Sequence, residues 1–157
     1  MSIGLDSLYT DIIFEHDKRP LHAGLREPFT AEVHHVNPTC GDEITLRLER
    51  DAAGPDARIV DISYDAQGCA MSRASASMMA DLLRGRTEAE NAAVVEAFEA
   101  AMASRGADAG DPEVLGDAVA LLGASKFPGR VKCVLMAWKA YRAALVEADA
   151  LGRGSAA

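Results

Sequence analysis

The sequence has only three cysteines, Cys40, Cys69 and Cys133, and this small odd number excludes a closed framework of internal disulfides. Aromatic residues are also scarce, at 5% of the 157 residues, whereas 49% of the residues are hydrophobic. A chain of this length and composition is expected to bury a useful core. We therefore expect one domain over 1–157, with a frayed tail at 152–157.

Positive charge is in the minority, with 16 Lys and Arg against 24 Asp and Glu, which gives a net charge of -8. Because binding to phosphate groups needs clustered positive charge, this balance argues against nucleic acid and against an anionic membrane surface as partners. The first residues do not resemble a signal peptide, and no stretch approaches the ~20 apolar residues of a membrane helix. We expect a cytoplasmic protein, whose thiols stay reduced.

Three segments alternate apolar and polar residues with the period of two that is typical of β-strands. In the second of them, Ile44, Leu46 and Leu48 alternate with Thr45, Arg47 and Glu49. Such alternation predicts antiparallel strands with one face in water. The predicted strands are 30–36, 43–50 and 58–66, joined by turns at 37–42 and 52–56.

Most of the remaining sequence has the spacing of helices. Thr87 and Glu90 form a capping-box pattern, and Asp111 followed by Pro112 is a strong helix start. The sequence therefore predicts an α+β fold, in which a three-stranded antiparallel sheet packs against helices. The predicted helices are 5–17, 70–84, 88–104, 112–122 and 129–151.

A possible metal site comes from the cysteines together with one carboxylate. Asp42 follows Cys40 by two residues, a spacing that lets both side chains point to one centre in a turn. Three thiols and one carboxylate make the four ligands of a tetrahedral zinc. A carboxylate beside sulfurs is the more exchangeable kind of ligand, so such a site is easier to open than one of four cysteines.

Cys69 and Cys133 lie at predicted helix starts, where the partial positive charge of the helix favours thiolate over thiol. Cys40 lies on a loop and is freer to leave a metal. Arg130 stands three residues before Cys133 and shares a helix face with it, so its guanidinium could hold a thiolate, a persulfide or a carboxylate.

Each of these residues alone also has a plainer interpretation. Cys133 could be an ordinary buried cysteine, Asp42 a turn residue and Arg130 a solvated helix-start residue. His34 and His35 fall on opposite faces of a strand, so we expect one on the surface and one in the core, and His16 to pack or hydrogen-bond near the end of the first helix. The joint occurrence of the cysteines and Asp42 favours the metal site.

Three motifs, in order, resemble those of the U-type iron–sulfur assembly proteins. They are Asn37-Pro38-Thr39-Cys40-Gly41-Asp42, Gly68-Cys69-Ala70-Met71-Ser72, and Arg130-Val131-Lys132-Cys133 with Trp138 after it. The resemblance covers roughly 5–146 and is closer to the SufU branch than to the IscU branch. Lys132 stands where IscU-type proteins have histidine, their Leu-Pro-Pro-Val-Lys motif is absent, and the chain has an extra segment at about 86–106.

The resemblance implies a SufE/IscU-like fold and a zinc ion held by Cys40, Asp42, Cys69 and Cys133. It also implies that the chain accepts persulfide sulfur from a SufS-type, pyridoxal-phosphate-dependent cysteine desulfurase, for iron–sulfur cluster assembly. Cys40 would be the acceptor and Arg130 a supporting residue. A downstream iron–sulfur scaffold would receive the sulfur, and we expect a monomer. Whether this sulfurtransferase activity, as a persulfide carrier, makes the chain an enzyme is left open.

Two other functions stay open at this point. The same four ligands could hold a nascent [2Fe–2S] cluster on a scaffold, or the metal could serve a purely structural zinc module for protein interaction. A scaffold is brown and holds its cluster, whereas a zinc protein is colourless. A structural module leaves the rate of a cysteine desulfurase unchanged.

Overall fold

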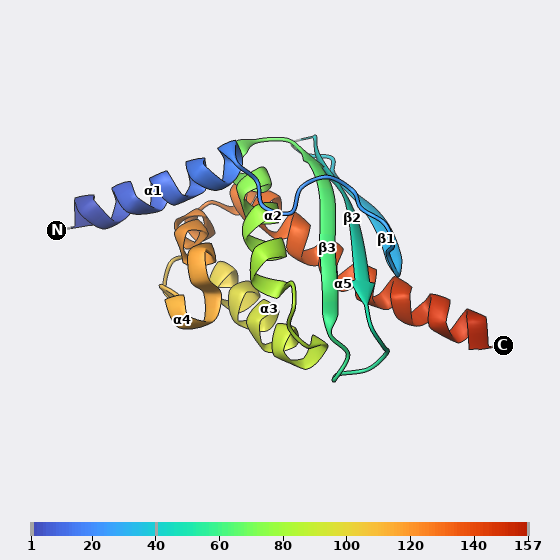
Figure 1. The fold of residues 1–157 in the computed structure, drawn as a ribbon. Helices are drawn as coiled ribbons and strands as arrows, with labels where there is room; N and C mark the ends of the chain where they lie inside the picture. The colour runs from blue at the N-terminus through green and yellow to red at the C-terminus, as the bar shows by residue number, and fades with distance from the viewer. Residues whose placement is uncertain (1, 40, 157) are drawn as a thin grey trace.

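The computed structural model describes the backbone of residues 2–39 and 41–156 and the side chains of residues 7–39 and 41–152. One helix comes first, three strands follow, and the remaining elements are helical (Figure 1). In order they are α1 (Ser2–Lys18), β1 (Ala31–Asn37), β2 (Asp42–Arg50), β3 (Ile59–Gln67), α2 (Ala70–Leu83), α3 (Glu88–Ala103), α4 (Pro112–Leu115), the 3₁₀ helix η1 (Gly116–Lys126) and α5 (Pro128–Ala156).

The strands form an antiparallel sheet in the order β1-β2-β3, as the alternating pattern predicted. Each predicted strand agrees with the structure to within one residue at either end. The register pairs Asn37 with Asp42, and Glu43 with Gln67, so the start of β2 and the end of β3 lie at the same end of the sheet. The buried residues of β2 are Asp42, Ile44, Leu46 and Leu48.

Helices α2 and α5 cover the inner face of the sheet, with α5 against β1 and β2 and α2 against β3 (Figure 1). The two helices are joined by the buried hydroxyl of Ser75 on α2, which donates to the carbonyl of Val134 at 2.6 Å and accepts from Trp138 Nε1 at 3.0 Å. These bonds fix α2 relative to α5, and they therefore fix the two helices that carry Cys69 and Cys133.

The extra segment at about 86–106 forms α3 and enters the hydrophobic core. The predicted capping box is confirmed, because Thr87 and Glu90 exchange both hydrogen bonds of that motif. Phe98 stacks on Trp138 of α5 with ring centroids 4.1 Å apart. Helix α3 is thus an integral part of the domain.

Two helical predictions differ from the structure. The segment 112–122 is not one α-helix, because Gly116 takes a φ of +53°, which ends α4 after Leu115, and the chain continues as the 3₁₀ helix η1. Helix α5 extends to Ala156, so helix covers most of the segment 152–157 that we expected to be frayed.

Over the described residues, no helix has both the length and the hydrophobicity needed to cross a bilayer.

Helix α1 is attached to the domain near its carboxyl end, while its amino end points away from the sheet (Figure 1). His16 is only 7% exposed and shares hydrogen bonds with Ser77 Oγ of α2 at 2.7 Å and Asp117 Oδ2 of η1 at 2.8 Å. The prediction that His16 packs or hydrogen-bonds near the end of this helix is therefore confirmed.

Candidate metal centre

Asp42, Cys69 and Cys133 converge on one point, although they are far apart in the sequence. One ligand atom from each lies within 4.8 Å of the other two. Asp42 begins β2, Cys69 is the N-cap of α2, and Cys133 lies in the second turn of α5. The site therefore forms where one end of the sheet meets the two helices that cover its inner face.

Asp42 reaches this point because it is in phase with the buried residues of β2. We expected it on the loop between two strands, but it is the first residue of β2, paired with Asn37, and it is 2% exposed. Its Oδ1 accepts a hydrogen bond from the Cys69 backbone N–H at 3.2 Å, and its Oδ2 lies 3.7 Å from Cys69 Sγ. A carboxylate beside two thiols is a combination of donors that a metal cation can bind.

Gly68 leaves the space that the Asp42 carboxylate fills. A Cβ atom at residue 68 would overlap Asp42 Oδ1 and would lie 2.5 Å from Asp42 Cγ. The φ of Gly68 is +149°, a conformation that residues with a side chain rarely adopt. Both features require glycine here, directly before the second cysteine.

The two described cysteines differ in their access to solvent. Cys69 is exposed, whereas Cys133 is 7% exposed. Cys133 Sγ lies 3.8 Å from the Asn37 Nδ2 donor and 3.7 Å from the Gly129 carbonyl. We expected Cys133 in the first turn of the last helix, but α5 begins at Pro128, which moves Cys133 to the second turn.

Two other predicted site residues are not part of this described set. Cys40 lies outside the described residues. Arg130 is exposed at the start of α5, where its guanidinium carbon lies 5.3 Å from the centre of the Phe127 ring. Arg130 also lines a cavity with Ala70 and Met71, the two residues that follow Cys69. Its role therefore stays a prediction.

Arg73 is a residue near the site that the sequence analysis missed. Its guanidinium donates to the Gly68 carbonyl at 2.7 Å and interacts electrostatically with Cys69 and Asp42. Arg73 stands four residues after Cys69, a spacing that places two residues on one face of a helix and could have indicated it.

The histidines of β1 lie as the alternation predicted. His34 is exposed and shares a hydrogen bond with Thr45 Oγ1 at 2.8 Å. His35 is half-buried on the inner side, and burial lowers its pKa, with a smaller contribution from the charge of His34. Neither belongs to the cluster of possible ligands found among the described residues.

The described donor set fits a zinc ion. Two thiols and a carboxylate supply three ligands, of two types that zinc takes in proteins, and the exposure of Cys69 gives the site an open side. Thiolates also bind iron in iron–sulfur clusters, so the same donors suit an iron–sulfur unit. The described donors can therefore bind a thiophilic metal ion, and the exposed Cys69 lies on the side of the site that is open to solvent.

Comparison with known proteins shows the family of this chain. The NifU-like N-terminal domain family matches residues 8–134. The iron–sulfur cluster assembly scaffold protein IscU of Streptococcus pyogenes serotype M1 is 37% identical over 141 residues, covering 90% of this chain and 84% of that protein. The zinc-dependent sulfurtransferase SufU of Bacillus subtilis (strain 168) is 36% identical over 137 residues, covering 87% of this chain and 88% of that protein.

A solved structure shares the fold as well. A proposed iron–sulfur cluster assembly scaffold protein for the SUF system from Fervidobacterium islandicum AW-1 superposes with a TM-score of 0.73 at 31% identity, covering 85% of this chain and 93% of that one. The predicted α+β fold and the predicted family resemblance are both confirmed. This chain belongs to the NifU-like N-terminal domain family.

Proposed function

We propose that this chain is a zinc-dependent sulfur acceptor of iron–sulfur cluster assembly, which takes persulfide sulfur from a cysteine desulfurase. The observation that carries the proposal is the convergence of ligand atoms from Asp42, Cys69 and Cys133 within 4.8 Å. The similarity to a zinc-dependent sulfurtransferase over 87% of the chain supports it.

Cys40 completes the proposed site as the fourth ligand and the sulfur acceptor. It precedes Asp42 by two residues, so chain geometry keeps the two Cα atoms within about 7 Å of each other. Zinc, when bound by Cys40, Asp42, Cys69 and Cys133, would stabilise the thiolate form of the cysteines without taking part in redox chemistry.

The proposed transfer is a thiol exchange. The Cys40 thiolate attacks the outer sulfur of the desulfurase persulfide, and a new S–S bond forms on Cys40. The S–S bond of the desulfurase persulfide breaks, and its electron pair leaves with the desulfurase cysteine as a thiolate. No external oxidant or reductant is needed. The exposed guanidinium of Arg130 would support the step by pairing with the charged persulfide.

A [2Fe–2S] scaffold is the second candidate. A relative named as a scaffold is 37% identical to this chain, about as similar as the sulfurtransferase. We rank the acceptor first because Lys132 replaces the histidine of IscU-type proteins, and because the resemblance to the SufU branch includes the segment that forms α3.

One experiment separates these functions. The chain is purified without oxygen, its metal is analysed, and it is mixed with a pyridoxal-phosphate-dependent cysteine desulfurase and L-cysteine while alanine release is measured. We expect a colourless zinc protein that accelerates alanine release. A brown protein that retains its cluster would identify a scaffold. An unchanged desulfurase rate would contradict the proposed acceptor function.

Replacing Asp42 with alanine is expected to weaken zinc retention while the fold is kept. The change removes the buried carboxylate from the site, and we expect zinc release to a chelator to accelerate by about tenfold or more. The matched control is Asp56→Ala, because Asp56 is an exposed carboxylate in the turn between β2 and β3. Equal release rates for Asp42→Ala and the unmodified chain would remove Asp42 from the site.

A further inference from the structure

The peptide unit between Gly68 and Cys69 is held at both of its ends. At one end, Arg73 Nη1 donates to the Gly68 carbonyl at 2.7 Å. At the other end, the Cys69 N–H donates to Asp42 Oδ1 at 3.2 Å. Because the carbonyl and the N–H belong to one planar group, a hydrogen bond at one end restricts the direction of the other.

Arg73 is itself held in place by Asp17 of α1. Its Nε donates to Asp17 Oδ1 at 2.6 Å, so the guanidinium spans from α1 to the loop before α2. The hydrogen bond to Asp17 raises the pKa of Arg73, and the charges of Cys69 and Asp42 add to this effect. A guanidinium can donate in two fixed directions at once, which a lysine ammonium on its flexible stem does less well.

We propose that Arg73 is a positioning residue of the metal centre. By fixing the Gly68–Cys69 peptide, Arg73 keeps Asp42 Oδ1 bonded to the Cys69 N–H. Asp42 Oδ2, which lies 3.7 Å from Cys69 Sγ, is then the oxygen offered to the metal. The consequence for metal binding rests on the proposed function, whereas the control of the peptide orientation does not.

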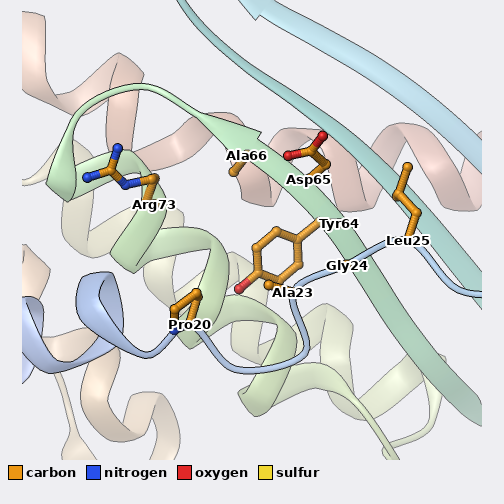
Figure 2. A pocket seen from close by; sticks show the side chains of 8 residues that line it. All are labelled: Pro20, Ala23, Gly24, Leu25, Tyr64, Asp65, Ala66 and Arg73. Carbon is orange, nitrogen blue, oxygen red and sulfur yellow. The ribbon is translucent and has the colours of Figure 1, made fainter.

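The space around Arg73 allows its side chain to be replaced without a steric clash. Figure 2 shows the Arg73 side chain on α2, close to the loop that joins the end of β3 to α2. It lines a cavity of about 250 Å³ together with Tyr64, Asp65 and Ala66 of β3 and residues 20 and 23–25 of the connection after α1. The unbranched side chain of methionine has space there, so Arg73→Met removes the hydrogen bonds without overpacking the core.

The first measurement uses the metal-free protein and follows amide hydrogen exchange at Cys69 by NMR. We expect Arg73→Met to accelerate this exchange by about tenfold or more. Without Arg73 the Gly68–Cys69 peptide is less restrained, so the hydrogen bond from the Cys69 N–H to the Asp42 carboxylate opens more often. Arg73→Lys keeps the charge but not the two-directional geometry, and we expect an intermediate rate. Asp17→Asn keeps the guanidinium but weakens its attachment to α1, and we expect a smaller increase.

The second measurement loads the same variants with Co²⁺, records the absorption of the ion, and measures its release to a chelator. We expect Arg73→Met to shift the spectrum and to accelerate release by about tenfold. The matched control is Arg142→Met, which removes an arginine of α5 paired with Glu99 of α3. We expect this control to leave both measurements unchanged.

The outcomes separate the two proposals. If Cys69 exchange in Arg73→Met and in Asp17→Asn equals that of the unmodified chain, Arg73 does not control the peptide and the inference is wrong. If exchange changes but Co²⁺ absorption and release do not, its role as a positioning residue of the metal centre is wrong. If the unmodified chain binds neither zinc nor cobalt, the proposed function fails, while the exchange measurement still decides whether Arg73 orients the peptide.

Discussion

Replacing Cys40 with serine is expected to abolish sulfur acceptance while the domain keeps its fold. A serine hydroxyl at neutral pH is a far weaker nucleophile than a thiolate, so the exchange with a persulfide should stop. The measurement is mass spectrometry of the chain after incubation with the desulfurase and L-cysteine. The unmodified chain should carry extra sulfur on the peptide that contains Cys40, and Cys40→Ser should carry none.

The exposure of the other cysteines gives this experiment its control. Of the two described cysteines, Cys69 is exposed and can be reached by a partner, whereas Cys133 is buried. Cys133→Ser removes a proposed ligand but leaves Cys40 in place, so some sulfur should still be found on Cys40. Sulfur recovered on Cys69 of the Cys40→Ser variant at the unmodified level would assign the acceptor role to Cys69 instead.

Replacing Gly68 with alanine should damage both the metal centre and the stability of the domain. The new Cβ would overlap Asp42 Oδ1, so either the carboxylate or the loop before α2 must move. We expect metal release to accelerate by about 10- to 100-fold, because the carboxylate loses its orientation. We also expect the free energy of unfolding to fall by at least about 2 kcal/mol, measured by urea denaturation.

Gly54→Ala is the matched control for this effect. Gly54 lies in the turn between β2 and β3 with a φ of +99°, and a Cβ there would meet nothing within 4 Å. This control introduces backbone strain without displacing a ligand, so it should cost stability, by about 1 kcal/mol, and leave metal release unchanged. Metal release in Gly68→Ala at the rate of the control would show that Gly68 does not protect Asp42.

The fold was largely predictable because local patterns and tertiary packing agree. The apolar residues that alternate along β2 are the ones buried in the structure. The Thr87–Glu90 capping box depends only on residues that are close in the sequence, so the sequence alone can indicate it. The segment 112–122 was less predictable because its composition suits an α-helix and a 3₁₀ helix alike. The positive φ of Gly116, which ends α4, is not encoded in a periodic pattern.

The site was predictable as a set of residue types, but less so as a geometry. The cysteine and aspartate motifs indicated a metal site, and three of the four proposed ligands do converge. The inward direction of Asp42 could have been inferred, because Asp42 is in phase with Ile44 on β2. The spacing from Cys69 could have indicated that Arg73 lies near the site, but not that it is attached to α1, since its hydrogen bond to Asp17 joins residues 56 positions apart in the sequence.

X-ray absorption at the zinc edge tests the central proposal most directly, because it identifies the atoms bound to the metal in solution. For the unmodified chain, we predict one zinc ion with three sulfur ligands at about 2.3 Å and one oxygen ligand at about 2.0 Å. In Asp42→Ala, the three sulfur ligands should remain and the original oxygen ligand should be replaced or lost. Fewer than three sulfurs around the zinc of the unmodified chain would contradict the convergence of Cys40, Cys69 and Cys133 on one ion.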